Sequence, residues 1–173
     1  MVSYFYKTFY QNLHVLQGGF DLKKLTLIVP CFNEQEALPF FYKEAISVLK
    51  NLNYEYELLF INDGSKDNTL NILKDFADRD ACVKYISFSR NFGKEAAMYA
   101  GFCNATGDYV AIMDADMQDP PDLLPEMLKL IESGEYDSVA TRRVSREGQP
   151  PIRSWFARRF YSPINKISDA DIV

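Results

Sequence analysis

From Leu25 to Thr141 the chain alternates short apolar runs with longer segments of helical pattern. The apolar runs cover residues 25–29, 56–61, 83–88, 109–113 and 138–141, and the helical segments cover 36–52, 66–80, 94–105 and 121–133. Strands that alternate with helices of this length form right-handed βαβ units around a parallel sheet. The sequence therefore predicts an α/β domain with a mostly parallel, Rossmann-like sheet and helices on both faces.

The charge is unevenly distributed along a chain whose net charge is -5. Of its 19 Lys and Arg residues, 7 lie between positions 142 and 167, where Glu147 is the only acid. The acidic remainder argues against general nucleic-acid binding, which normally requires a basic face. The basic end, in contrast, suits an anionic ligand or surface.

The cysteines and the hydropathy of the chain indicate the cellular compartment in which it is expected. The three cysteines, Cys31, Cys82 and Cys103, are widely spaced and odd in number, which is typical of a reducing compartment. No segment approaches the roughly 20 continuous apolar residues that a spanning helix needs. We therefore expect a chain that is soluble or peripheral to a membrane.

Polar and charged residues directly follow four of the predicted strands. In open α/β sheets, ligands bind at the carboxyl ends of the strands, near the point where strand order reverses. Four loops are thus predicted to converge on one rim. Their sequences are Pro30-Cys31-Phe32-Asn33-Glu34, Asn62-Asp63-Gly64-Ser65, Arg90-Asn91-Phe92-Gly93-Lys94 and Asp114-Ala115-Asp116-Met117-Gln118-Asp119.

The last of these loops is the most informative. Asp114, Asp116 and Gln118 alternate in sequence, so an extended backbone presents three oxygen-bearing groups to one place. Such ligands suit Mg²⁺ or Mn²⁺, especially when a substrate phosphate adds further oxygens. Capping of the next helix is the alternative for Asp119, which precedes Pro120, but it leaves Asp114 and Asp116 unexplained.

The other loops carry weaker signals. Asp63 lies in a turn-forming sequence, and it is equally suited to a loop and to a hydrogen bond with a nucleobase or ribose. Pro30, Phe32 and Glu34 are candidates to line a flat base, although Glu34 also suits a helix N-terminus. Lys94 begins a predicted helix and favours an anion there, or it marks a plain helix start.

Several enzyme classes lack their motifs. The only histidine, His14, precedes the predicted domain, which excludes a histidine-based nucleophile relay within it. The chain contains no Gly-x-x-x-x-Gly-Lys-Ser/Thr, and no Gly-x-Gly-x-x-Gly follows the first predicted strand. The absence of these motifs argues against a nucleotide hydrolase and against a dehydrogenase.

The two ends do not follow the alternating pattern. In the aromatic-rich extension 1–24, Phe5, Phe9 and Leu13 recur near helical spacing and predict a weak amphipathic helix, with a packed or frayed extension as the alternative. In the segment 146–173, apolar and basic residues interleave. This pattern indicates either a membrane-proximal helix or one packed on the domain.

The four rim segments together resemble family 2 glycosyltransferases of the polyprenyl-phosphate hexosyltransferase branch. The matching segments are Leu27–Glu34, Phe60–Asp67, Ser89–Ala97 and Met113–Pro121, and the resemblance covers about residues 24–172. They are similar to bactoprenol glucosyltransferases and, more distantly, to dolichol-phosphate mannose synthases. The resemblance implies a GT-A fold.

The resemblance also implies a reaction and a location. The reaction is the inverting transfer of a hexose, with glucose favoured, from a nucleotide sugar to a polyprenyl phosphate at the cytoplasmic face of a membrane. UDP-glucose is the favoured donor and GDP-mannose the other candidate. An anionic acceptor phosphate needs little help from a general base.

Residue roles follow from the same resemblance. It assigns the metal and diphosphate site, with Mg²⁺ or Mn²⁺, to Asp114, Ala115, Asp116 and Gln118. It assigns Pro30, Phe32, Glu34 and Asp63 to the nucleotide, and Arg143 to a phosphate. Asp114, Asp116 and Arg143 are the implied catalytic residues.

Members of this branch continue past the equivalent of residues 168–172 into a segment that completes the acceptor site. The resemblance therefore implies a GT-A domain at 25–145 and an incomplete acceptor region at 146–173. The alternative is an inactive remnant that binds a nucleotide sugar or a protein partner. The resemblance does not determine the oligomeric state, and a homo-oligomer is one candidate.

Overall fold

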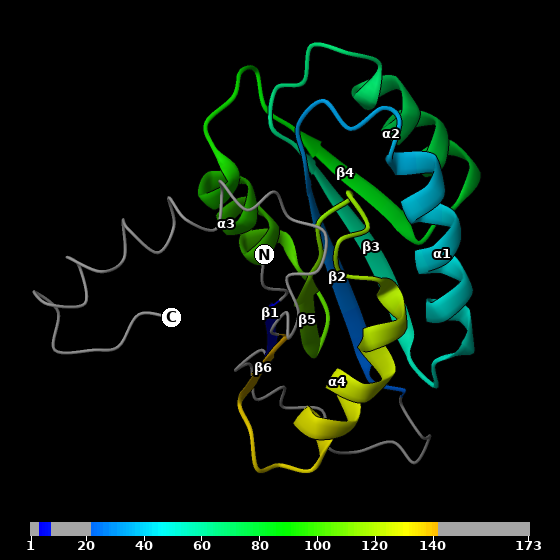
Figure 1. Cartoon of the computed structure of the whole chain (residues 1–173), viewed down its shortest axis with the longest axis vertical. Helices are drawn as coiled ribbons and strands as arrows, with labels where there is room; N and C mark the ends of the chain where they lie inside the picture. The colour runs from blue at the N-terminus through cyan, green and yellow to red at the C-terminus, as the bar shows by residue number, and fades with distance from the viewer. Residues whose placement is uncertain (1–3, 8–21, 142–173) are drawn as a thin grey trace, which may run out of the picture. The chain divides into compact units, whose positions relative to one another are not determined.

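A computed structural model describes residues 4–7 and 22–141, and the structural statements below concern this part of the chain. Its strands form a six-stranded sheet in the order β4-β3-β2-β5-β1-β6 (Figure 1). The strands are β1 (Tyr4–Lys7), β2 (Lys24–Cys31), β3 (Glu55–Asn62), β4 (Val83–Ser87), β5 (Tyr109–Ile112) and β6 (Ser138–Ala140).

The sheet is mostly parallel, as predicted. β2 pairs in parallel with both β3 and β5, and β3 pairs in parallel with β4. β1 is antiparallel to both of its neighbours, β5 and β6, so β6 runs in the same direction as β5. The chain proceeds from β2 to β3 and β4 on one side and then crosses to β5 on the other. Strand order thus reverses at β2 and β5, where a ligand site is expected.

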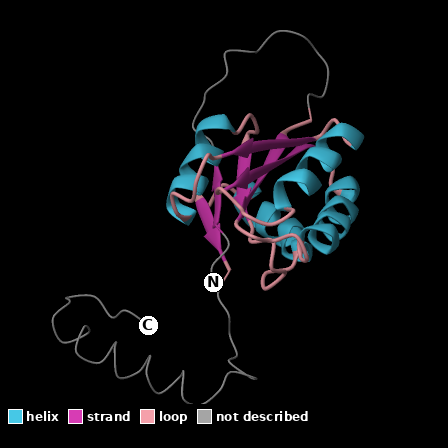
Figure 2. Ribbon diagram, turned by 90° about the horizontal axis from the view of Figure 1, so that it is seen from above, coloured by secondary structure: helices cyan, strands magenta, loops and turns pink. Residues whose placement is uncertain are grey.

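Helices cover both faces of the sheet, as Figure 2 shows. They are α1 (Leu38–Asn51), α2 (Thr69–Arg79), α3 (Lys94–Asn104) and α4 (Leu124–Glu132), with a 3₁₀ turn at Pro121–Leu123. The larger core includes Phe41 of α1, Phe76 of α2 and Leu128 of α4, which pack with one face of the strands. Ala97 of α3 belongs to a smaller core on the opposite face.

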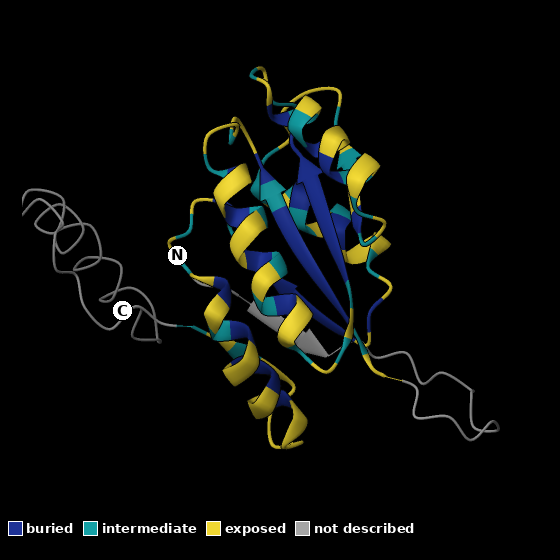
Figure 3. Cartoon of the chain, turned by 90° about the vertical axis from the view of Figure 1, so that its right-hand side faces the viewer, coloured by how far each residue is buried: buried dark blue, intermediate teal, exposed yellow. Residues whose placement is uncertain are grey.

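Burial on both faces explains the apolar strand sequences. In β2, Leu27 and Val29 belong to the larger core and Ile28 to the smaller one. A strand covered on both sides reads as a continuous apolar run rather than an alternating one. Figure 3 shows the corresponding pattern in the helices, which are buried towards the sheet and exposed on the outside.

The amino-terminal extension differs from its predicted helix. Residues 4–7 form strand β1, which pairs with β5 from Tyr4↔Ile112 to Lys7↔Tyr109. The near-helical spacing was a misleading signal here, because aromatic residues also favour strands and two open strand edges were available for pairing. Residues 8–21 lie outside the described part, so the rest of that prediction is not decided.

Three predicted helices begin later than expected; in the third, the 3₁₀ turn Pro121–Leu123 precedes α4, which begins at Leu124. α1 begins at Leu38 rather than at position 36, and α2 begins at Thr69 rather than at position 66. In both cases the preceding residues are held in loops by hydrogen bonds between loops, which compete with helix formation. The 3₁₀ turn has Pro120 rather than Asp119 at its N-cap position and makes no side-chain cap.

A buried carboxylate fastens the end of the sheet opposite to the predicted rim. The Glu57 side chain is 2% exposed, and it accepts hydrogen bonds from Thr26 Oγ1 (2.7 Å), Thr106 N (2.8 Å) and Lys84 Nζ (2.8 Å). Burial alone would raise the pKa of Glu57, but these bonds outweigh it and lower the pKa to about 2. We call this group the amino-end network.

None of the helices in the described ranges is both long and apolar enough to cross a bilayer.

Candidate active site

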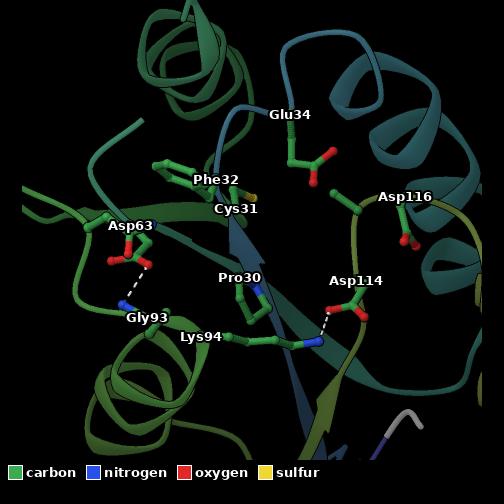
Figure 4. Close-up of a pocket in the computed structure, with 12 residues that line it drawn as sticks. Pro30, Cys31, Phe32, Glu34, Asp63, Gly93, Lys94, Asp114 and Asp116 are labelled. Atoms are coloured by element: carbon green, nitrogen blue, oxygen red, sulfur yellow. Dashed lines mark hydrogen bonds and ion pairs between the residues drawn. The ribbon is translucent and has the colours of Figure 1, made fainter. Parts of the chain in front are cut away.

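A pocket of about 260 Å³ lies at the carboxyl ends of β2, β3 and β5, beside the first turn of α3 (Figure 4). It is therefore located at the point where strand order reverses. Its lining residues are Pro30, Cys31, Phe32, Glu34, Asp63, Asn91, Gly93, Lys94, Ala97, Asp114, Ala115 and Asp116.

Most of the predicted site residues that the structure describes meet in this pocket. Seven of them line it: Pro30, Phe32, Glu34, Asp63, Asp114, Ala115 and Asp116. Gln118 is exposed and is not part of the lining, although its backbone N–H donates to Asp116 Oδ1 at 3.0 Å. Arg143 and the basic segment 146–173 lie outside the described residues.

The loop that carries Phe32 and Glu34 is fixed to the loop after β3. Asn33 has a positive φ of 57°, and its side-chain Oδ1 accepts a hydrogen bond from Lys66 N at 2.8 Å. Its backbone N–H donates to Ser65 Oγ, and Glu34 N donates to Thr69 Oγ1. Asn tolerates this left-handed conformation better than most residues. The bonds place the side chains of Phe32 and Glu34 on the pocket wall.

Asp63 connects the tip of β3 to the loop before α3. Its side chain is buried, and its two carboxylate oxygens accept hydrogen bonds from Phe92 N (2.7 Å) and Gly93 N (3.0 Å). Gly64 has a φ of 65°, and a Cβ there would lie only 2.6 Å from Arg90 Cα. The two loops are thus in contact through their backbones. A contact between Asp63 and a nucleotide stays a prediction.

Asp114 is paired with a lysine across the floor of the pocket. The Lys94 side chain extends from α3 past Pro30, and its Nζ lies 2.6 Å from Asp114 Oδ1 (Figure 4). The two side chains are 39% and 15% exposed. An ion pair that is partly shielded from water is stronger than one on the open surface.

The remaining acids of the pocket repel each other. Burial raises the pKa of Glu34, and the negative charges of Asp116, Asp114 and Asp67 raise that pKa further. Burial likewise raises the pKa of the Cys31 thiol well above its ordinary value, with Glu34 and Asp114 adding to the effect. Cys31 is therefore a poor nucleophile. The pocket holds more negative charge than its own cation neutralises.

The donor atoms fit a divalent cation in part. Asp114 and Asp116 supply the hard carboxylate oxygens that Mg²⁺ and Mn²⁺ prefer. Within residues 4–7 and 22–141, however, no three His, Cys, Asp or Glu side chains are grouped as a ready metal site. A cation held here would need further oxygens, which substrate phosphates commonly supply.

Five further residues line the pocket: Cys31, Asn91, Gly93, Lys94 and Ala97. The first four lie in loops that were predicted to form the rim, and Lys94 was a candidate to favour an anion there, but its pairing with Asp114 was not predicted. Ala97 gave no chemical signal, since it contributes only the small side chain of a packed helix.

Comparison with known proteins identifies relatives that match most of this chain. The family model described as Glycosyl transferase family 2 matches residues 26–171. A putative glycosyltransferase CsbB of Bacillus subtilis is 45% identical over 148 residues, which are 86% of this chain and 44% of the relative. A prophage bactoprenol glucosyl transferase homolog of Escherichia coli is 42% identical over 149 residues, 86% of this chain and 48% of the relative. The chain thus spans about half the length of these curated relatives.

Solved structures confirm the fold. The mannosyltransferase PcManGT from Pyrobaculum calidifontis, in complex with GDP-Man and Mn²⁺, superposes with a TM-score of 0.55 at 23% identity, covering 62% of this chain and 32% of that one. TarS 1-349 of S. aureus gives a TM-score of 0.54 at 21% identity, covering 64% and 32%. The predicted GT-A fold is confirmed. With the family model matching most of its length, the chain belongs to the family 2 glycosyltransferases.

Proposed function

We propose that this chain is the nucleotide-sugar-binding part of an inverting hexosyltransferase whose acceptor is a polyprenyl phosphate. The family supports glycosyl transfer, and the E. coli relative and those of Shigella phages SfX and SfV are named bactoprenol glucosyl transferases or a homolog. Glucose is accordingly the favoured hexose and UDP-glucose the favoured donor, with GDP-mannose as the competitor. A lipid-linked acceptor of this kind supports a reaction at a membrane surface, and we propose the cytoplasmic face, which the family resemblance implies.

One observation carries the proposal. Four loops that are far apart in sequence bring Glu34, Asp63, Lys94 and Asp114 to a single pocket at the strand-order reversal. This excess of acids at a pocket suits a complex of a divalent cation with a diphosphate better than it suits a free anion.

Each part of the pocket has a role in this proposal. Phe32 is 41% exposed on the pocket wall, so its ring is available to contact a flat base, with Pro30 beside it. Asp116 and Asp114 would hold Mg²⁺ or Mn²⁺, which neutralises charge on the diphosphate when bound. An oxygen of the acceptor phosphate attacks the anomeric carbon in line, and the bond to the diphosphate breaks with its electron pair leaving on the nucleotide.

Calorimetry on the full 173-residue chain tests donor binding. UDP-glucose and GDP-mannose are titrated with Mn²⁺ or with EDTA into the chain, Asp116→Ala and the control Asp78→Ala, which removes an exposed acid from α2 outside the pocket lining. We expect metal-dependent binding that weakens more than tenfold, about 1.4 kcal/mol, in Asp116→Ala and is unchanged in the control. Equal binding in EDTA would refute the proposed site.

Transfer of radiolabelled hexose to polyprenyl phosphate then distinguishes an active chain from one that binds without turnover. The same assay on a version extended by the acceptor region of a relative shows whether the bound donor is competent. Donor binding without transfer in both would support the non-catalytic alternative.

A further inference from the structure

The charges around the pocket are arranged in a chain of contacts that crosses three loops. Asp63 at the tip of β3 binds the backbone of Phe92 and Gly93, and Gly93 directly precedes Lys94, the first residue of α3. Lys94 in turn pairs with Asp114 after β5. The loop after β3 therefore fixes the start of α3, and the loop after β5 holds the ammonium group of Lys94.

We propose that Lys94 is a built-in counter-ion, which disfavours a divalent cation at Asp114 until the diphosphate of a nucleotide sugar attracts its ammonium group away. This inference rests on the proposed function and adds to it a coupling between donor and metal. Lys94 is a positioning and binding residue in this scheme.

The first argument is competition for one carboxylate. A cation that approaches Asp114 meets an ammonium group already 2.6 Å from Oδ1. Like charges this close repel strongly in a pocket that is partly shielded from water. In the absence of the donor, the metal is left mainly with Asp116, whose Oδ1 also accepts the N–H of Gln118.

The second argument is that a diphosphate changes this balance. Its oxygens offer Lys94 a stronger anionic partner and offer the metal additional ligands. Figure 4 shows the Lys94 side chain lying along the pocket floor between Gly93 and Asp114, so a diphosphate in this pocket would be within its reach. Asp114 would then be released to the metal or to a sugar hydroxyl.

Thermodynamic linkage makes the effect reciprocal. If the diphosphate raises the affinity for the metal, the metal raises the affinity for the diphosphate by the same factor. Removal of the ammonium group should therefore have two effects of opposite sign. The metal alone should bind more tightly, and the metal–nucleotide complex should bind more weakly.

The test uses the full chain as wild type, Lys94→Met, Lys94→Arg and the control Lys74→Met, which removes an exposed lysine of α2 outside the pocket lining. Calorimetry with MnCl₂ alone should show roughly tenfold tighter binding in Lys94→Met only. With saturating Mn²⁺, UDP should bind roughly tenfold more weakly in Lys94→Met and about as in wild type in Lys94→Arg.

A merely structural role would give another result. Weaker binding of both Mn²⁺ and UDP in Lys94→Met, together with a lower melting temperature, would overturn the proposal, as would unchanged Mn²⁺ binding. Asp114→Asn provides a second measurement, because it removes the partner of the ammonium group. Adding Lys94→Met to Asp114→Asn should no longer tighten Mn²⁺ binding, and a persistent gain would contradict the competition.

Failure of the proposed function remains distinguishable. If wild type binds neither UDP nor UDP-glucose with Mn²⁺, the nucleotide-sugar function fails. The titration with MnCl₂ alone still decides whether Lys94 competes with a cation.

Discussion

The pKa values of two glutamates, one at each end of the sheet, are shifted in opposite directions. At the amino end, hydrogen bonds from Thr26, Thr106 and Lys84 lower the pKa of Glu57 to about 2 despite its burial. At the carboxyl end, burial and neighbouring acids raise the pKa of Glu34. One end satisfies its charge internally, whereas the other holds charge that an external cation would satisfy. The contrast teaches which carboxylates fasten the fold and which are available for a ligand.

The largest effect is expected from breaking the amino-end network. Glu57→Ala leaves the hydroxyl of Thr26 and the N–H of Thr106 without their acceptor and two lysines without their counter-charge. We expect the free energy of unfolding to fall by about 3 kcal/mol, since one partner of a buried charged group is removed. Urea denaturation measures this loss. Glu55→Ala, at an exposed position of the same strand, should cost less than about 0.5 kcal/mol.

Acid should weaken the same network in wild type. The pKa of Glu57 is about 2 in the folded state and 4.5 in the reference state, so its stabilisation is complete above the reference value and is lost as pH falls towards 2. We expect a loss of about 3 kcal/mol over that interval from this group, measured as the difference between wild type and Glu57→Gln. An equal slope in both proteins would show that Glu57 does not contribute.

Glycines at the two ends separate stability from binding. An alanine Cβ at Gly64 would lie 2.6 Å from Arg90 Cα, and one at Gly107 would lie 2.6 Å from Thr26 N. Each substitution should cost about 2 kcal/mol in urea denaturation, because the Cβ contacts backbone that cannot easily move. Gly64→Ala should also weaken UDP binding, since it displaces the loop that carries Lys94. Weaker UDP binding in Gly107→Ala would contradict the division between the two ends.

Sequence reasoning predicted the five strands from β2 to β6, the edge strands β4 and β6 included, but it missed β1, which lies between β5 and β6. The periodicity of apolar residues and the alternation of strands with helices were sufficient to predict β2 to β5 and their helices, because burial on both faces leaves a strong apolar signal. β1 was missed, since four residues carry little pattern and their place depends on strand edges formed by distant segments. Long-range pairing of this kind is not encoded in local periodicity.

Within the site, the residues that line the pocket were largely predictable from the sequence, whereas their ion pairs and hydrogen bonds were not. Asp114 and Asp116 were predicted as site residues from their place after a buried strand, and both line the pocket. The sequence did not show that Asp114 pairs with Lys94, or that each carboxylate oxygen of Asp63 accepts a hydrogen bond from a backbone N–H group. Those contacts depend on loop conformations such as the positive φ of Asn33, Gly64 and Gly93.

The smallest effect, and the one with the opposite sign, concerns Glu34. Its raised pKa means that its negative charge is disfavoured in the folded protein, chiefly by burial and then by Asp116 and Asp114. Glu34→Gln keeps the shape and removes the charge, so at neutral pH it should stabilise the chain by about 0.5 kcal/mol. It should also weaken Mn²⁺ binding, because one negative charge leaves the pocket. Glu36→Gln, at an exposed position just beyond the pocket lining, is the matched control and should change neither quantity. A destabilised Glu34→Gln would show that this glutamate fastens the rim as Glu57 fastens the other end, and the contrast between the two ends would fail.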